Sequence, residues 1–435
     1  MTFNKLALAT AVLSLAACGG SKSSSNNSSN NGNSNSSNPS ANCQSDIDNG
    51  KGQGITALPE NAGQQYKQHF CKYTKLSAPN GKPIHFYAQN KISNEQMVRA
   101  RNILKFYLTD VPNSEYGADK SAVWNQMANN QATLIMFNGS DGDIEVPEIN
   151  GQTLFETENV VEGSAAYLVN EPRDAAFEEI LHLMHDTGIG VDFSGAMKGV
   201  LPAYQAEIRA ATNNAAPASL VAGGKGIWAS GSMFNSWLAE LKAEGSLTQE
   251  YLAAVIDGYY GLAGKSSAEG FNDIYAPQTR AEIKTKDPMG WTLMGEGNNR
   301  KYFSEYVTYT GRIDPSYEGT FTLTFDANTK YTYKSQYLLD ATLLGDKNTN
   351  LIGNDQNNHL TGNAGDNVLT GKSGNDVIDG GEGSDTAVFT GTASEYTVTT
   401  SGSDIVVADT IADRDGTDTL KNIELIQYSD AAVTP

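Results

Sequence analysis

The chain has 435 residues, enough for two or three domains with a substantial hydrophobic core. Its 50 aspartates and glutamates exceed its 30 lysines and arginines, and the formal net charge is −20. This negative charge argues against nucleic acid as a partner and favours cation binding or plain solubility.

The N-terminus has the pattern of a bacterial secretion signal. Lys5 precedes an apolar stretch, residues 6–17, that is too short to span a membrane as a mature helix. The sequence LAAC, which ends at Cys18, resembles the lipobox of bacterial lipoproteins. The resemblance implies removal of residues 1–17, a lipid on the Cys18 sulfur and, because Gly19 rather than an aspartate follows, an outer-membrane location. An ordinary signal peptide with a chance cysteine, and hence a cell-surface or secreted protein, is the alternative.

Residues 18–42 are nearly all serine, asparagine and glycine, and this composition predicts a flexible tether with nothing to bury. If Cys18 carries a lipid, Cys43 and Cys71 remain as a pair in an oxidising compartment. We therefore expect a disulfide between these two cysteines, with two free thiols as the alternative.

Residues 43–330 are predicted to form a globular body of the mixed α+β class that is mostly helical. Three segments have apolar residues at helical spacing, and two have the composition of short strands. The predicted helices are 93–108, 174–186 and 233–245, and the predicted strands are 84–90 and 132–139. Ser93 is expected to open the first of these helices, and Gly245 to close the third.

The helix predicted at 174–186 carries the best candidates for catalytic chemistry. At about 100° per residue, Glu178, His182 and His185 fall on one face beside an apolar stripe, and Gly188 is expected to end the helix. Two imidazoles and a carboxylate, with one position left for water, are the usual ligands of a catalytic zinc ion.

This segment resembles the H-E-x-x-H motif of the zincin metallopeptidases, but here it reads E-E-x-x-H. The resemblance implies that Glu179 is the general base and His182 a zinc ligand. Glu178 stands where the family has its first histidine, so His185 is the candidate replacement ligand and either glutamate is a candidate base.

A third zinc ligand is expected at Glu305, which the surrounding aromatic residues place in the middle of a helix. The sequence F-S-E that ends at Glu305 resembles the F-x-E of zincins whose last ligand is a late glutamate. Two alternatives stay open: the Glu/His face is a hydrogen-bonded polar seam, and Glu305 is a surface or salt-bridged residue. No G-x-S-x-G, P-loop or G-x-G-x-x-G motif supports another kind of enzyme.

Near the C-terminus the sequence repeats every nine residues. The four units read GNDQNNHLT, GNAGDNVLT, GKSGNDVID and GGEGSDTAV, starting at Gly353. Glycines permit tight, partly left-handed turns, the sixth position carries an acid in the last two units, and the eighth is mostly a large aliphatic residue. The pattern predicts a parallel β-roll with one turn per unit and an aliphatic ladder inside. The ladder residues are Leu351, Leu360, Leu369 and Ile378.

These units resemble the RTX, or haemolysin-type, calcium-binding repeat. The resemblance implies Ca²⁺ between stacked turns, bound by Asp376 and Asp385 together with backbone groups such as those of Gly374 and Gly383. Asn367 takes the acid position of an earlier unit, so we expect one or two well-formed sites at the C-terminal end and weaker sites upstream. A flexible Gly/Asn/Asp linker is the alternative.

The predicted roll covers residues 331–385, and residues 386–435 are expected to cap it with further strands. The sequence therefore predicts a calcium-binding, extracytoplasmic lipoprotein with a zinc peptidase-like body that acts on a polypeptide. Its membrane contact is expected through the lipid alone, without nucleic acid. A non-catalytic, calcium-stabilised surface or adhesion protein is the alternative function.

Overall fold

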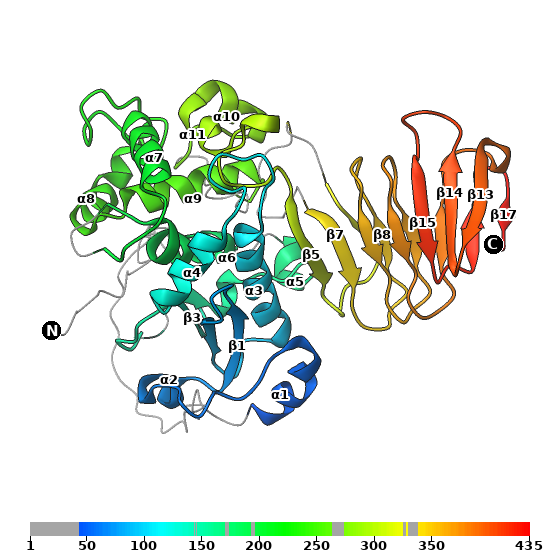
Figure 1. The fold of residues 1–435 in the computed structure, drawn as a ribbon, viewed down its shortest axis with the longest axis horizontal. Helices are drawn as coiled ribbons and strands as arrows, with labels where there is room; N and C mark the ends of the chain where they lie inside the picture. The colour runs from blue at the N-terminus through cyan, green and yellow to red at the C-terminus, as the bar shows by residue number, and fades with distance from the viewer. Residues whose placement is uncertain are drawn as a thin grey trace, which may run out of the picture.

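The computed structural model describes residues 43–435 except 143, 145, 170–173, 193–195, 263–273, 325–327 and 329–337. The signal segment, Cys18 and the tether therefore lie outside the described residues, as does the predicted boundary between body and roll at 330–331. A mixed body occupies one end of the molecule and a stack of strands the other, so the molecule is elongated (Figure 1).

The body is built on a four-stranded sheet of order β1-β2-β3-β4. Its strands are β1 (Lys72–Ser77), β2 (Pro83–Ala88), β3 (Thr133–Phe137) and β4 (Gln152–Phe155). β1 is antiparallel to β2, whereas β2, β3 and β4 are parallel. A disulfide joins Cys43 to Cys71, with Cα atoms 6.0 Å apart, and ties the segment before the first helix to the start of β1.

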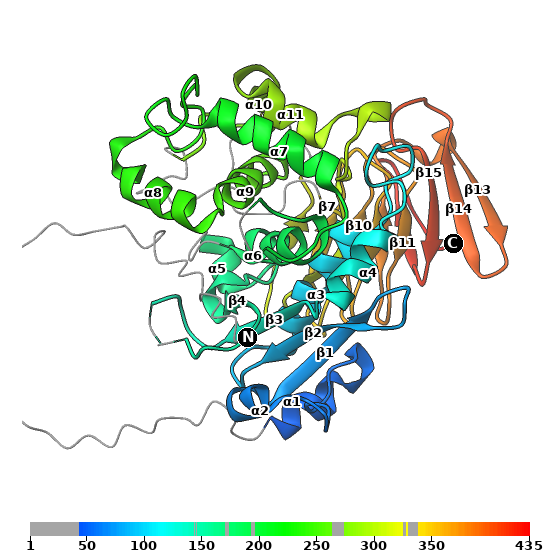
Figure 2. The ribbon, with the colours of Figure 1, turned by 60° about the vertical axis from the view of Figure 1, so that its left-hand side comes forward.

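Helices cover the sheet and form a second layer above it. They are α1 (Gln44–Gly50), α2 (Gln64–His69), α3 (Asn94–Leu108), α4 (Ser121–Asn129), α5 (Ala165–Val169), α6 (Ala176–Met184), α7 (Pro202–Ala215), α8 (Asn235–Glu244), α9 (Leu247–Tyr259), α10 (Arg280–Lys286) and α11 (Pro288–Met294). Short 3₁₀ turns cover Lys51–Gln53, Glu156–Glu158, Ser232–Phe234, Gly297–Asn299 and Ala393–Glu395. α6 contacts α3, α9 and β4, so it lies between the sheet and the upper helices (Figure 2).

The helices predicted at 93–108, 174–186 and 233–245 and the strands predicted at 84–90 and 132–139 are confirmed, apart from one helix end, whereas the helix expected around Glu305 is absent from the residues described there. Ser93 opens α3 with a capping box, and Gly245 closes α8 in a left-handed conformation. Gly188, expected to end the α6 helix, instead lies inside a π-helical extension, His185–Ile189. A Cβ on Gly188 would lie 2.8 Å from side-chain atoms of the neighbouring α4, so this glycine serves close helix packing rather than termination.

The C-terminal strands form two facing sheets. The first roll sheet contains, in spatial order, β13 (Tyr396–Ser401), β14 (Asp404–Asp409), β15 (Thr417–Lys421), β11 (Val377–Asp379), β9 (His359–Thr361), β7 (Leu338–Leu343) and β5 (Val307–Ile313). The second roll sheet contains β17 (Ala432–Val433), β16 (Leu425–Gln427), β12 (Thr386–Val388), β10 (Val368–Thr370), β8 (Asn350–Ile352) and β6 (Thr320–Thr322). All pairings from β5 to β15 and from β6 to β16 are parallel.

The aliphatic ladder is buried as predicted, but it alternates between the sheets. Leu351 lies beside Leu369 in the second roll sheet, and Leu360 lies beside Ile378 in the first. Each nine-residue unit therefore supplies one strand and one turn, and a full coil takes two units rather than the single unit expected from the sequence. All four side chains are fully buried.

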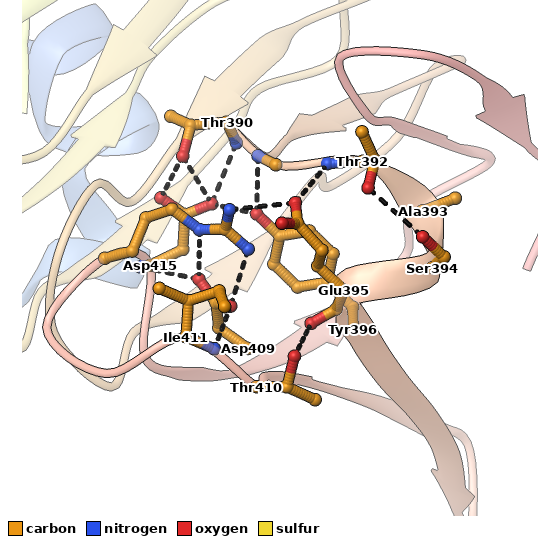
Figure 3. Close-up of polar contacts among 12 residues, drawn as sticks. Thr390, Thr392, Ala393, Ser394, Glu395, Tyr396, Asp409, Thr410, Ile411 and Asp415 are labelled. Atoms are coloured by element: carbon orange, nitrogen blue, oxygen red, sulfur yellow. Dashed lines mark hydrogen bonds and ion pairs between the residues drawn. The ribbon is translucent and has the colours of Figure 1, made fainter.

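The end of the roll is closed by an antiparallel hairpin, β13–β14, which extends the first roll sheet. Arg414 forms ion pairs with Asp409 (2.7 Å) and Glu395 (2.9 Å) at its base. Asp415 accepts hydrogen bonds from the Thr390 backbone N–H and hydroxyl, both 2.8 Å (Figure 3). These contacts fix the hairpin against the last coil, as expected for a cap.

The parallel sheets begin before the predicted roll. β5 and β6 precede residue 331 and already pair with β7 and β8. β5 also contacts α3 of the body, and one continuous hydrophobic core runs from Ile55 to Tyr428. The roll is therefore built directly onto the body.

Candidate metal centres

The turns of the roll stack along two edges. At edge A the chain crosses from the second roll sheet to the first, through residues 353–358 and 371–376. The turn between β14 and β15, both in the first roll sheet, stacks beside residues 371–376 on this edge. At edge B it crosses back, through residues 344–349, 362–367, 380–385 and 422–424. Asp376 therefore lies on edge A and Asp385 on edge B.

On edge A, hydrogen bonds to carboxylates link successive turns. Asp376 Oδ1 accepts the backbone N–H of Asn358 at 2.7 Å, and the Asp376 N–H donates to Asp418 Oδ1 at 2.8 Å. Asp376 is only 1% exposed, and its Oδ2 has no hydrogen-bond partner among the described residues. This oxygen lies 2.1 Å from the place that a Cβ on Gly371 would take, so only glycine leaves room for it.

Edge B repeats this arrangement nine residues further on. Asp385 Oδ1 accepts the backbone N–H of Asn367 at 2.8 Å, and the Asp385 N–H donates to Glu424 at 2.7 Å. Asp385 is 1% exposed, and its Oδ2 also lacks a hydrogen-bond partner within the described chain. A Cβ on Gly380 would lie 2.6 Å from this oxygen and 2.1 Å from the carbonyl oxygen of Asn422. A carboxylate and a backbone carbonyl thus converge on one place.

Burial makes these carboxylates costly to ionise. It raises the pKa of Asp376 to about 7, with a smaller contribution from Asp415, and backbone hydrogen bonding opposes the shift. Burial likewise raises the pKa of Asp385 to about 6 and that of Asp418 to about 8. Because a bound cation would compensate the buried charge, carboxylate and carbonyl oxygens in this setting suit a hard ion such as Ca²⁺.

Gly374 and Gly383 have a steric role beside these carboxylates. Their φ angles are +129° and +121°. A Cβ would come within 2.7 Å of the Gln356 carbonyl oxygen at Gly374, and within 2.6 Å of the Gly365 carbonyl oxygen at Gly383. The two glycines therefore let neighbouring turns stack closely enough for carbonyl oxygens of one turn to face the next.

Asn367 takes the same position in its turn as Asp376 and Asp385, but its amide has other partners. Its Nδ2 donates to the carbonyl oxygen of Thr349 at 2.8 Å and to Asn363 Oδ1 at 3.0 Å. Its Oδ1 accepts the backbone N–H of Asn363 at 2.8 Å. The side chain predicted as a weak calcium ligand is thus engaged in protein hydrogen bonds.

A second group lies in the body, between α6 and α9. One ligand atom from each of Glu178, His182 and Glu250 lies within 4.8 Å of the others, close enough to share a metal ion. The three residues are 5%, 1% and 9% exposed. Glu178 and His182 were predicted from their helical spacing, which places them one turn apart on α6.

Glu179 lies beside this group. Its Oε2 is 3.9 Å from His182 Nδ1 and accepts a hydrogen bond from Gln152 Nε2 of β4 at 2.6 Å. Burial raises the pKa of Glu179 well above its usual range, and the nearby carboxylates of Glu158, Glu178 and Glu250 add to the shift. Glu179 therefore lies where a general base would be expected, next to His182 and on the side of α6 that faces β4.

The structure places His185 and Glu305 elsewhere. His185 Nε2 is hydrogen bonded to Gln205 Oε1 of α7 at 2.6 Å. Glu305 was expected in mid-helix, but it precedes β5 outside any helix, where it forms an ion pair with Arg300 and lies 3.9 Å from Arg280. The two arginines neutralise the Glu305 carboxylate, as the alternative of a salt-bridged residue predicted.

Glu250 was missed because it is distant in sequence from the E-E-x-x-H segment. It lies in α9, a helix that is buried along its whole length from Thr248 to Tyr259. A glutamate beside a long apolar run, residues 251–256, is unusual in a buried helix, since buried carboxylates need a partner. That signal could have marked Glu250 as a candidate.

A buried ion cluster holds the N-terminal end of α6. Arg99 of α3 contacts Asp174 through two nitrogens, at 3.1 and 2.5 Å, and Glu162 at 3.0 Å. Asp174 also accepts the backbone N–H of Ala176, the first residue of α6, at 3.2 Å. The start of the helix that carries Glu178 and His182 is thus fixed to α3.

Comparison with known families gives one match. Residues 352–387 match the RTX calcium-binding nonapeptide repeat, in four copies. The chain contains RTX repeats. These repeats imply calcium ions as partners, and RTX repeat proteins are typically extracellular or secreted. No curated protein matches this chain. Among the described residues, the helices are all too short or too polar to cross a membrane.

Proposed function

We propose that the protein is an extracytoplasmic calcium-binding lipoprotein whose C-terminal roll is completed by calcium ions between its last turns. The observation that carries this proposal is the pair of buried carboxylate oxygens, Asp376 Oδ2 and Asp385 Oδ2, that lack hydrogen-bond partners in the described chain. When bound, Ca²⁺ would supply the positive charge that these oxygens lack. The ion would thereby couple folding of the roll to the millimolar calcium outside the cell.

Thermal unfolding of the full chain in EDTA and in CaCl2, followed by far-UV circular dichroism, tests this proposal. At 10 mM Ca²⁺ and a Kd of about 0.1 mM, each ion adds about 2.7 kcal/mol to stability. The roll transition should therefore move to higher temperature in CaCl2 and less in MgCl2. Identical melting curves in EDTA and CaCl2 would remove the proposal.

The anchor is proposed from the lipobox alone, on Cys18. Substitution of Cys18 by alanine should move the protein from the membrane fraction to the soluble extracytoplasmic fraction, and should abolish labelling by a radioactive fatty acid. Serine substitution at another site of the tether, Asn31→Ser, is the matched control. Unchanged labelling in Cys18→Ala would exclude this anchor.

For the body, the group of Glu178, His182 and Glu250 favours a second proposal, a zinc-dependent peptidase that acts on a polypeptide. A carboxylate, an imidazole and a second carboxylate form an acceptable donor set for zinc. Zinc, when bound, would supply a Lewis acid that activates water. The protein would contribute Glu179 as the proton acceptor, held by Gln152.

Metal analysis of the purified chain separates this proposal from a non-catalytic surface or adhesion module. One zinc per chain should be present in the wild type, retained in His185→Gln and lost in His182→Gln and Glu250→Gln. His185→Gln is the matched control because His185 is also buried but bonds to Gln205. Peptide cleavage is then assayed with Glu179→Gln, which should keep zinc and lose activity. A metal-free wild type with no effect of zinc on its melting temperature supports the non-catalytic module.

A further inference from the structure

The four repeat turns fall into two kinds, distinguished by their second and sixth residues. The first two turns carry asparagine at both positions: Asn354 with Asn358, and Asn363 with Asn367. The last two turns carry Lys372 with Asp376, and Gly381 with Asp385. Each kind occurs once on edge A and once on edge B, so the difference does not depend on the edge.

In the first turn, side-chain amides close the turn from within. Asn358 Nδ2 donates to the carbonyl oxygen of Leu339 at 3.0 Å and to Asn354 Oδ1 at 2.9 Å. Asn358 Oδ1 in turn accepts the backbone N–H of Asn354 at 2.7 Å. The amide nitrogen thus satisfies a backbone carbonyl of the preceding coil and the side chain at position two.

The second turn repeats this pattern on the opposite edge. Asn367 Nδ2 donates to the carbonyl oxygen of Thr349 and to Asn363 Oδ1, and Asn367 Oδ1 accepts the N–H of Asn363. Asn358 and Asn367 are 3% and 1% exposed, so both networks are shielded from water. Two separate turns with the same set of bonds show that the pattern is a property of the asparagine pair.

The last two turns have no such network. Lys372 and Gly381 at position two take left-handed conformations, with φ of +70° and +93°, which Asn354 and Asn363 do not. At position six, an ionised carboxylate can only accept hydrogen bonds, so it cannot donate to the carbonyl oxygens that face it. No N–H or O–H of the described chain donates to Asp376 Oδ2 or Asp385 Oδ2.

We infer that the asparagine amides at positions two and six replace calcium in the first two turns, and that only the last two turns require the ion. Asn358 Oδ1 and Asn367 Oδ1 lie against the first glycine of their turns, as Asp376 Oδ2 and Asp385 Oδ2 do. The asparagine oxygens accept the position-two N–H, where the aspartate oxygens would meet the ion. This inference rests on the proposed calcium binding of the roll and specifies which turns use it. The half of the roll next to the body then folds without metal, and the distal half with its hairpin responds to calcium.

Charge supports the same division. The amide-closed turns bury neutral groups at position six, whereas the last two turns bury carboxylates beside Asp418 on edge A and Glu424 on edge B. When calcium is lost, these carboxylates repel one another, and this repulsion arises only in the last two turns. The junction with the body, through β5 and β6, lies at the other end of the stack.

Two measurements on the full chain test the inference. Equilibrium dialysis gives the number of calcium ions bound per chain. Hydrogen exchange, read by mass spectrometry in EDTA and in 10 mM CaCl2, gives the protection of each segment. The wild type should bind two calcium ions. Amides of 359–370 should be protected in both buffers, and amides of 377–388 should exchange about 100-fold faster in EDTA, which corresponds to a Kd of about 0.1 mM.

Variants separate the asparagine pair from a general effect of substitution. Asp376→Asn alone should bind one ion and leave edge A unprotected in both buffers, because Lys372 supplies no acceptor. Adding Lys372→Asn should restore protection of edge A in EDTA without a second ion. Asn367→Asp should make residues 368–370 chelator-sensitive.

The outcomes distinguish the inference from the proposed function. A wild type that binds no calcium, with exchange unchanged by EDTA, overturns both. A wild type that binds three or more ions, or that loses protection of 359–370 in EDTA, overturns the inference while calcium binding stands. Failure of Lys372→Asn with Asp376→Asn to restore protection also overturns it.

Discussion

The buried guanidinium of Arg99 is expected to be the largest single electrostatic contribution to the stability of the body. Arg99 is 4% exposed and pairs with two carboxylates, Glu162 and Asp174. In Arg99→Met, a change of similar volume, Glu162 keeps the Tyr309 hydroxyl (2.5 Å) and Asp174 keeps the Ala176 N–H (3.2 Å), but neither keeps a cation among the described residues. Removal of one partner from a buried ion cluster costs about 3–5 kcal/mol.

Arg101→Met is the matched control on the same helix. Arg101 is partly buried and donates to neutral acceptors, the Gln53 carbonyl oxygen and the Thr74 hydroxyl. Loss of these two hydrogen bonds costs about 1–2 kcal/mol. The free energy of unfolding is measured in urea by tryptophan fluorescence, at constant CaCl2. All four tryptophans report on the body: Trp124, Trp228, Trp237 and Trp291.

The pH dependence of the Arg99→Met defect checks its cause. Burial already raises the pKa of Asp174, and the Arg99 charge opposes that shift. Without Arg99, the Asp174 carboxyl of the folded state should bind a proton that the unfolded state releases above about pH 4. The free energy of unfolding of the variant should therefore rise as pH falls from 7 to 5. The defect should therefore shrink at pH 5. An Arg99→Met defect no larger than that of Arg101→Met, or one that grows at pH 5, would refute the reasoning.

Three further changes have expected outcomes in the same assays. Burial lowers the pKa of Lys120 to about 7, and an unfolded lysine keeps its proton to about pH 10. Stability should therefore rise between pH 7 and 9 by up to about 1.4 kcal/mol per pH unit, and Lys120→Met should flatten this rise. Replacing Cys43 and Cys71 by serine opens a loop with a sequence separation of 28 and should cost about 3–4 kcal/mol in urea unfolding, with no further loss in reductant. Gly416→Ala should lower the melting temperature of the roll far more than Gly402→Ala, because both glycines have positive φ but only at Gly416 would a Cβ meet a backbone oxygen, at 1.7 Å. Equal effects of the two alanines would contradict the steric argument.

The sequence predicts the roll well because its signals are local. Glycine, acid and aliphatic positions recur within nine residues, and each unit supplies one turn and one strand, as Leu360 and Ile378 illustrate. The start of the sheets could not be predicted in this way. β5 and β6 lack the glycine pattern and join the stack through pairing with β7 and β8, which is a long-range contact.

The candidate site of the body was predicted only where helical spacing determines it. Glu178 and His182 share a face of α6, and the structure brings them together. Glu250 reaches them from α9, and no local pattern specifies which helix packs on α6. His185 has the right spacing, but its imidazole is hydrogen bonded to Gln205 of α7. Glu305 lies outside any helix and pairs with arginines. Tertiary packing decides these partners.

Anomalous scattering from a crystal grown in CaCl2 would locate the calcium ions of the roll. We expect two calcium peaks per chain, one bonded to Asp376 Oδ2 and one to Asp385 Oδ2, each at about 2.3–2.6 Å and with backbone carbonyl oxygens completing the ligands. The places filled by the side chains of Asn358 and Asn367 should hold no peak. An absence of calcium at both aspartates, in a roll that is nevertheless fully ordered, would show that the roll does not need the ion.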